Sequence, residues 1–163
     1  MLDTINVRIG EYYVTNNPHI LVSLGLGSCV AIMLYDPMAK VGGLAHTALA
    51  TSTGNQAKGN PGKFAATAID AMVKEMIDLC ANKKRIIAKI VGGACMFSPV
   101  GKKTPPIMKI GERNVAAVKS KLEAEGISLV GEDTGGDYGR SLKFITSSGK
   151  VAVKSIRYGE KEL

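Results

Sequence analysis

A cysteine at the end of a glycine-rich turn is the residue of this sequence best suited to chemistry. Cys29 follows the segment Leu24-Gly25-Leu26-Gly27-Ser28 and stands directly before an apolar run. A substrate can approach a thiol in this setting, and a nearby imidazole can take its proton. The pattern therefore indicates a cysteine nucleophile. The alternative is a buried cysteine that begins a core strand.

Two histidines are available as the base, His19 and His46. His46 lies on a segment that we expect to run back beside the strand after Cys29, whereas His19 lies in a turn signal that points to solvent. A third group must orient the imidazole, and Ser23, six residues before Cys29, offers a nearby hydroxyl. Each residue alone is typical of an ordinary strand or turn, but the combination favours a catalytic set of Cys29, His46 and Ser23.

The main-chain amides around Cys29 can stabilise negative charge. A free thiol has a pKa of about 8.5, so a nucleophilic cysteine needs assistance at neutral pH. The amides of the Gly27-Ser28-Cys29 turn can lower that pKa and hold an oxyanion, although glycines here also simply permit a tight turn. No third glycine and no Gly-Lys-Ser/Thr ending follows, which excludes a dinucleotide site or a nucleotide P-loop.

The composition excludes several other classes of protein. The three cysteines are widely spaced and form no Cys-x-x-Cys pair, so we expect free thiols and no structural zinc. The thiol chemistry itself requires no metal or organic cofactor, so we expect none. Lys and Arg number 21 against 14 Asp and Glu, a net charge of +7 that favours an acidic partner. The lysines are dispersed without interleaved aromatics, so nucleic acid is not an expected partner. No apolar run approaches the roughly 20 residues that cross a bilayer, so we expect a cytoplasmic protein without membrane insertion.

The elements that position Cys29 and His46 are read as a hairpin. Strands are predicted at 20–22, 30–35 and 41–47, and Asp36-Pro37 ends the middle one. The pairing of the second and third strands brings His46 back towards Cys29. A polar loop over 51–62 follows, and Asn60 and Pro61 are expected to begin a helix whose apolar stripe includes Cys80.

The second half alternates strands and one further helix. A strand over 86–91 ends at Gly92-Gly93, and a helix over 112–125 buries Val115, Val118 and Leu122. Strands recur at 128–130, 142–146 and 151–156. This order predicts an α+β fold with a mixed or antiparallel sheet, in a single domain over 1–163.

Together these segments resemble the chemoreceptor glutamine deamidase family, CheD. The resemblance extends from about residue 8 to residue 157. The segments that carry it, in chain order, are Leu24–Ala31, Ala45-His46, Lys63-Phe64 with Ala68-Ile69, Ala88–Phe97, Ile110–Val115 and Asp133–Arg140. The family implies a mixed β-sheet sandwich with flanking helices, similar to cysteine-dependent deamidating toxins.

The resemblance also implies an activity and its residues. Members convert selected glutamines of methyl-accepting chemotaxis receptors to glutamates, releasing ammonia, and hydrolyse glutamyl methyl esters. Their triad is cysteine, histidine and threonine. The matching positions are Cys29, His46 and Ser23, so a serine stands where the family has threonine. The oxyanion amides are expected around Gly27 and Ser28.

The resemblance implies two partners, the receptor as substrate and the phosphatase CheC, which competes with it. We expect Gly92, Gly93, Met96 and Phe97 to contribute to the partner surface, although Met96 and Phe97 also fit a core. An alternative function is a non-catalytic module that regulates CheC by binding alone.

Overall fold

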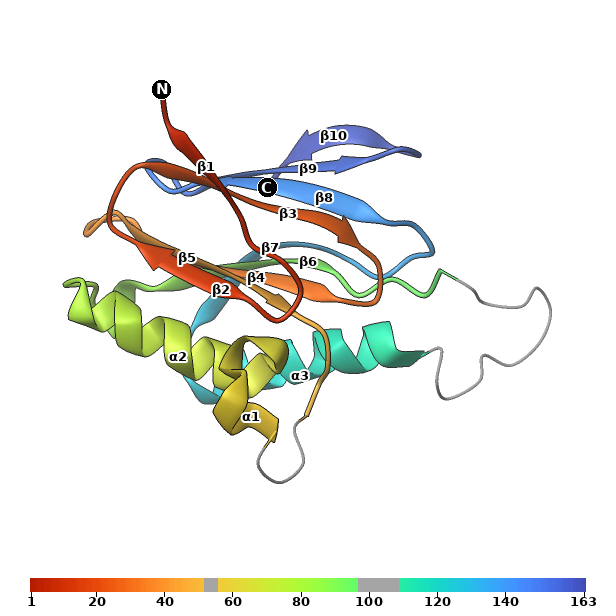
Figure 1. Ribbon diagram of the computed structural model, residues 1–163, viewed down its shortest axis with the longest axis horizontal. Helices are drawn as coiled ribbons and strands as arrows, with labels where there is room; N and C mark the ends of the chain where they lie inside the picture. Colours follow the sequence, from red (N-terminus) through yellow and green to blue (C-terminus); the bar gives the residue numbers. More distant parts are fainter. Residues whose placement is uncertain (52–55, 97–108) are drawn as a thin grey trace.

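The chain folds as two stacked β-sheets with helices against the outer face of one of them (Figure 1). The computed structural model describes residues 1–51, 56–96 and 109–163. Each sheet has five strands, and each contains both parallel and antiparallel pairs. The expected α+β fold with a mixed sandwich and flanking helices is therefore confirmed.

The first sheet is built from the two ends of the described chain. Its strands, in spatial order, are β1 (Asp3–Asn6), β3 (His19–Leu26), β8 (Arg140–Ile145), β9 (Lys150–Ser155) and β10 (Gly159–Glu162). β1 runs parallel to β3, and the other pairs are antiparallel. The short edge strands β1 and β10 were not anticipated, because their residues are almost all exposed and give no apolar alternation.

The second sheet contains the predicted hairpin. Its spatial order is β2 (Tyr12–Thr15), β5 (Val41–Thr47), β4 (Val30–Asp36), β6 (Ile87–Gly92) and β7 (Ser128–Thr134). β4 pairs antiparallel with both β5 and β6, and β6 pairs parallel with β7. All residues of β4 and β5 are buried, which explains why β4 is a continuous apolar run.

The core consists of two layers separated by the second sheet. Val30, Ile32 and Leu34 face the helices, whereas Ala31 and Met33 face the first sheet. This alternation follows from the two-residue period of a strand. The interior between the sheets therefore receives the odd-numbered side chains of β4, and Cys29 continues that series.

Two long helices, α2 (Ala65–Asp78) and α3 (Ile110–Ala124), cover the outer face of the second sheet (Figure 1). The shorter helical elements are α1 (Gln56–Gly59) and the 3-10 turns η1 (Pro61–Lys63) and η2 (Lys83–Arg85). In the described parts of the chain no helix is long and apolar enough to span a membrane.

The structure corrects two local predictions around α2. The helix begins at Ala65, because Pro61 opens the separate turn η1 and Asn60 makes no side-chain capping bond. Cys80 is exposed, since α2 ends at Asp78 and Cys80 adopts a left-handed conformation with φ 71°. The N–H of Ala81 donates to the carbonyl of Met76 and closes the helix end.

Candidate active site

Cys29 and His46 lie on the same face of the second sheet. His46 on β5 is paired directly with Ala31 on β4, and Cys29 precedes Ala31 by two residues. Cys29 also packs against the apolar cluster between the sheets. Residues placed diagonally in this way have Cα atoms about 7–8 Å apart, within reach of an imidazole ring. His19 begins β3 at the end remote from Leu26 and the Cys29 turn.

The hydrogen bonds of His46 determine which ring nitrogen carries the proton. Nδ1 lies 3.3 Å from the carbonyl oxygen of Val7. A carbonyl only accepts, so Nδ1 is the donor and neutral Nε2 has a free lone pair. Nε2 is buried and has no hydrogen-bond partner among the described residues. The ring is thus oriented as a base with an unused acceptor.

Ser23 is linked to His46 through the main chain. It is fully buried on β3, and its hydroxyl donates to the carbonyl of Val7 at 2.9 Å. The same carbonyl accepts from His46 Nδ1. Val7 also donates its N–H to the carbonyl of Val22, so the shared acceptor is fixed on both sides. Sequence reasoning missed Val7, because a main-chain carbonyl leaves no signature in residue type.

Burial shifts both titratable groups towards their neutral forms. It raises the pKa of the Cys29 thiol above 9.0, although the main-chain N–H of Cys29 itself acts in the opposite direction. It lowers the pKa of His46 below 6.5, partly offset by the Val7 carbonyl and the Glu11 carboxylate. At neutral pH Cys29 is therefore a thiol and His46 an uncharged imidazole, and no hydrogen bond joins them in this structure.

The Cys29 turn is held through its carbonyl groups. Ala94 donates its N–H to the carbonyl of Gly27 at 2.9 Å, and Gly93 donates to the carbonyl of Cys29 at 2.8 Å. The carbonyl of Ser28 accepts from the side-chain amide of Asn114 at 2.9 Å. No other described main-chain group accepts from the main-chain N–H of Ser28 or Cys29. These two donors are the candidates for oxyanion binding.

The residues predicted as a partner surface divide into two groups. Gly92 and Gly93 are buried and have positive φ angles of 119° and 68°. A Cβ at Gly92 would collide with the carbonyl of Cys29, so both glycines support the turn and present no surface to a partner. Met96 is 46% exposed, and its sulfur lies 3.1 Å from where a Cβ on Gly27 would stand. Phe97 lies outside the described residues.

An open groove of about 770 Å³ adjoins the nucleophile turn. Its lining includes Gly25 from the turn, Met96, and Ile156 and Arg157 from the connection between β9 and β10. Leu24, next to Gly25, is 60% exposed. The groove is largely apolar and carries basic side chains, which suits a protein segment with apolar and acidic residues.

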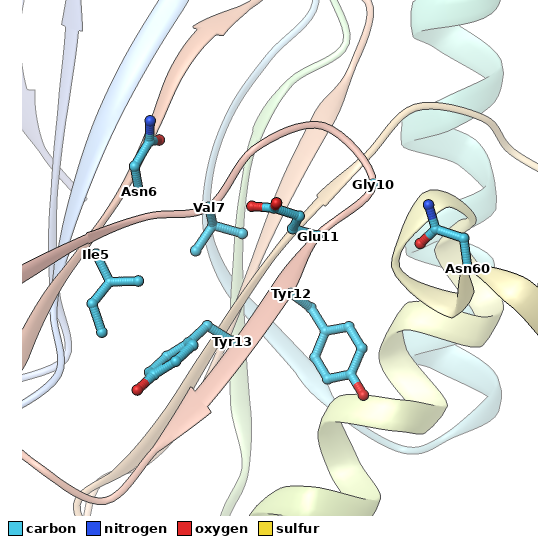
Figure 2. Close-up of a pocket in the computed structure, with 8 residues that line it drawn as sticks. All are labelled: Ile5, Asn6, Val7, Gly10, Glu11, Tyr12, Tyr13 and Asn60. Carbon is cyan, nitrogen blue, oxygen red and sulfur yellow. The ribbon is translucent and has the colours of Figure 1, made fainter.

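A second cavity, of about 390 Å³, lies along the segment that supports His46 (Figure 2). Figure 2 shows the Glu11 carboxylate pointing towards Val7, while Tyr12 points towards α2. The main chain of this segment holds the base strand, since His46 donates to the carbonyl of Glu11 at 3.0 Å and accepts from Gly10 at 2.8 Å. The cavity therefore lies next to the residues that hold His46, and Cys29 is not among the residues that line it.

Asn114 is the second residue that sequence reasoning missed. It is 1% exposed on α3 and lies four residues before Val118 and eight before Leu122, on the predicted apolar stripe. A polar side chain on that stripe was the available signal. Within the described chain no group of three His, Cys, Asp or Glu side chains forms a metal site.

The mixed β-sandwich thus places the Cys29 thiol and an oriented neutral imidazole, His46, on one inner face of the second sheet. A family model described as "CheD chemotactic sensory transduction" matches residues 48–155. The chain is 48% identical over 96% of its length to the probable chemoreceptor glutamine deamidase CheD of Caldanaerobacter subterraneus, of which 96% is covered. It is 47% identical over 94% of its length to the chemoreceptor glutamine deamidase CheD of Thermotoga maritima, of which 93% is covered. The chain belongs to the CheD family.

Two further similarities differ in strength. The probable chemoreceptor glutamine deamidase CheD 2 of Geobacter metallireducens is 46% identical over 164 residues, with 100% of both chains covered. Among solved structures, the hypothetical protein YfiH of Bacillus licheniformis is 16% identical and covers 75% of this chain and 49% of its own, with a TM-score of 0.44. The second similarity is too low to add to the family assignment.

Proposed function

We propose that this protein deamidates selected glutamines of chemotaxis receptors, with Cys29 as nucleophile and His46 as base. The observation that carries the proposal is the buried Nε2 of His46, which has no hydrogen-bond partner among the described residues and lies on the same sheet face as Cys29. The names of the full-length relatives support the substrate class, a protein glutamine in a chemoreceptor. The basic charge of the chain and the groove beside the turn favour a protein segment as substrate.

The first half-reaction forms a thioester. Nε2 of His46 takes the thiol proton as Cys29 Sγ bonds to the carboxamide carbon of the glutamine. The carbonyl oxygen becomes an oxyanion, which accepts from the main-chain N–H groups of Ser28 and Cys29. The C–N bond then breaks, and His46 returns the proton to the leaving nitrogen. Ammonia departs, and the receptor side chain remains bound to sulfur.

The second half-reaction releases glutamate. His46, neutral again, takes a proton from water as the water oxygen attacks the thioester carbon. The C–S bond breaks, the thiolate recovers the proton from His46, and the receptor carries a carboxyl group. A glutamyl methyl ester follows the same path with methanol as the leaving group, so ester hydrolysis is part of the proposal. No step requires a cofactor.

Ser23 acts on this base indirectly in our proposal. Its hydroxyl and His46 Nδ1 both donate to the Val7 carbonyl, so Ser23 fixes the acceptor that fixes the ring. A threonine at this position makes the same bond with its rotamer more restricted. The serine of this chain therefore keeps the arrangement that the threonine of the family implies.

We place CheC on the surface that the substrate also uses. The exposed Met96 borders the groove at the nucleophile turn, so a protein bound there would block a receptor segment. Competition between CheC and a receptor fragment is the measurable consequence. A CheC concentration that saturates binding without slowing receptor deamidation would separate the two surfaces.

The direct test is product analysis on a purified receptor cytoplasmic fragment. Peptide mass spectrometry is expected to find specific glutamines converted to glutamates, with one ammonia released per site. The matched control is the same fragment with those glutamines replaced by alanine, which releases no ammonia. An unmodified receptor fragment after prolonged incubation with folded protein would overturn the proposal.

A further inference from the structure

The buried amide of Asn114 connects the two segments that carry the candidate catalytic residues. Its Nδ2 donates to the carbonyl of Ser28 at 2.9 Å and to the carbonyl of Ala48 at 3.0 Å. Ser28 directly precedes the nucleophile, and Ala48 follows the base by two residues. One side chain on α3 thus uses both of its N–H groups to join the Cys29 turn to the end of β5.

This connection lies where the strand ladder stops. β4 and β5 are paired from Val30 and Thr47 inwards, so neither Cys29 nor Ala48 belongs to a strand. The β4–β5 ladder therefore ends before Cys29 and Ala48, and its hydrogen bonds do not include either residue. Asn114 spans this unpaired end, across 86 residues of sequence to Ser28 and 66 residues to Ala48.

The first turns of α3 are themselves tightly seated on the nucleophile turn. A Cβ at Gly111 would stand 2.6 Å from the carbonyl oxygens of Gly93 and Ala94, so backbone packs directly on backbone. Gly93 and Ala94 are the residues that donate to the carbonyls of Cys29 and Gly27. Helix α3 thus contacts the nucleophile turn in two ways, through Gly111 packed on Gly93 and Ala94 and through the hydrogen bond from Asn114 to Ser28. Asn114 also connects the helix to the end of β5.

The side-chain oxygen of Asn114 lowers the stability of the fold. Oδ1 is buried without a hydrogen-bond partner among the described residues. An unpartnered buried acceptor costs about 1–3 kcal/mol, so a residue chosen for stability alone would be apolar here. The neighbours of Asn114 on the stripe, Val118 and Leu122, show the residue types that helix packing favours.

We infer that Asn114 is a positioning residue, which sets the distance and angle between Cys29 and His46 by donating to Ser28 and Ala48. This inference rests on the proposed function for the identity of the reaction and not for the geometry. Displacement of a reacting group by about 1 Å can cost about 100-fold in rate. Loss of the connection is therefore expected to lower kcat and to leave KM nearly unchanged.

The first test compares Asn114→Ala with Thr146→Val. Thr146 is equally buried, and its hydroxyl makes main-chain hydrogen bonds to Asn17 and His19 at the end of β8 remote from the site. Both variants lose buried hydrogen bonds, but only Asn114→Ala removes the connection between the Cys29 turn and the end of β5. We expect kcat, measured on folded protein, to fall about 10- to 100-fold for Asn114→Ala and to stay within about twofold for Thr146→Val. Equal kcat values for both variants would overturn the inference.

The second test uses Asn114→Asp, which has nearly the same shape. An ionised carboxylate cannot donate to two carbonyl oxygens, whereas a protonated one donates to one of them. We expect the rate of Asn114→Asp relative to the parent to fall as pH rises across its titration. A constant ratio over the whole pH range in which the parent is folded would contradict a positioning role.

A third readout needs no receptor and keeps the two proposals separable. Iodoacetamide labelling of Cys29, followed at the peptide level to resolve it from Cys80 and Cys95, reports the coupling of the thiol to His46. In the parent, we expect the pH profile of the Cys29 alkylation rate to contain a step set by the titration of His46. Asn114→Ala should shift or flatten this step, and Thr146→Val should leave it unchanged. If the parent deamidates no receptor yet this shift is present, the proposed function fails and the positioning role stands. An unshifted profile in Asn114→Ala overturns the positioning role alone.

Discussion

The Asp36 carboxylate at one end of strand β4 and the His46 imidazole near the other differ in how fully their polar atoms are hydrogen-bonded, although the Tyr35 hydroxyl beside Asp36 is also buried without a partner among the described residues. At one end the carboxylate of Asp36, 0% exposed, accepts from Arg85 and from the main-chain N–H groups of Met38, Ala39 and Asn82. At the other end His46 Nε2 and Asn114 Oδ1 are buried without partners among the described residues. Saturated networks stabilise a fold, whereas unsatisfied buried groups lower stability and are kept where function uses them. We assign stability to the Asp36 end and chemistry to the Cys29 end.

The largest effect is expected from His46→Asn. The asparagine amide can still donate to the carbonyl of Val7, but it cannot take a proton. We expect the deamidation rate to fall about 1,000-fold, while the free energy of unfolding changes by less than about 1 kcal/mol. Ammonia release and urea unfolding measure the two quantities. A large loss of stability with the rate preserved would reverse our assignment of this end.

The complementary change is Asp36→Ala. Burial alone would raise the pKa of Asp36, but the Arg85 guanidinium and three main-chain donors hold it well below its ordinary value. Removal of the carboxylate leaves those donors unpaired, so we expect a loss of about 3 kcal/mol in the free energy of unfolding. The kcat of the folded fraction should stay within about twofold. Asp36→Asn, which keeps one acceptor, is the matched control and should lose less.

A smaller effect is expected at Ser23, because it acts through Val7. Ser23→Ala removes one donor to a carbonyl that His46 still engages, so we expect a rate loss of about 10-fold, equivalent to about 1.4 kcal/mol. Ser23→Thr keeps the bond and should stay within about threefold of the parent. A loss as large as that of His46→Asn would instead give Ser23 a direct role on the ring.

The smallest effect concerns acid pH. The unfolded chain protonates its histidines near 6.5, whereas buried His46 resists protonation until a lower pH. The unfolded state thus binds the extra proton first, and stability contributed by neutral His46 is lost as pH falls below about 6.5. The free energy of unfolding should therefore fall more for the parent than for His46→Asn when the pH is lowered from 7.5 to 5.5. An equal fall in the two proteins would contradict a buried neutral base.

The sequence predicts the hairpin well and its surroundings poorly. The apolar run of β4, the Asp36-Pro37 break and the returning β5 predict a hairpin that brings His46 back towards Cys29, because these signals are local. The structure adds the register, in which Ala31 pairs with His46. The carbonyl of Val7 carries no residue-type signal, and the Asn114 contacts close only across the folded sheet. The short exposed strands β1 and β10 follow from pairing with their neighbours and not from their own residues.

The central claim is that Cys29 attacks a receptor glutamine, and the rate of ammonia release by Cys29→Ala tests it most directly. The variant should keep its fold, because Cys29 is partly exposed and forms no disulfide. Measured at a saturating concentration of receptor fragment, its release should equal the background of the fragment alone. Ammonia release at the rate of the parent would contradict the account.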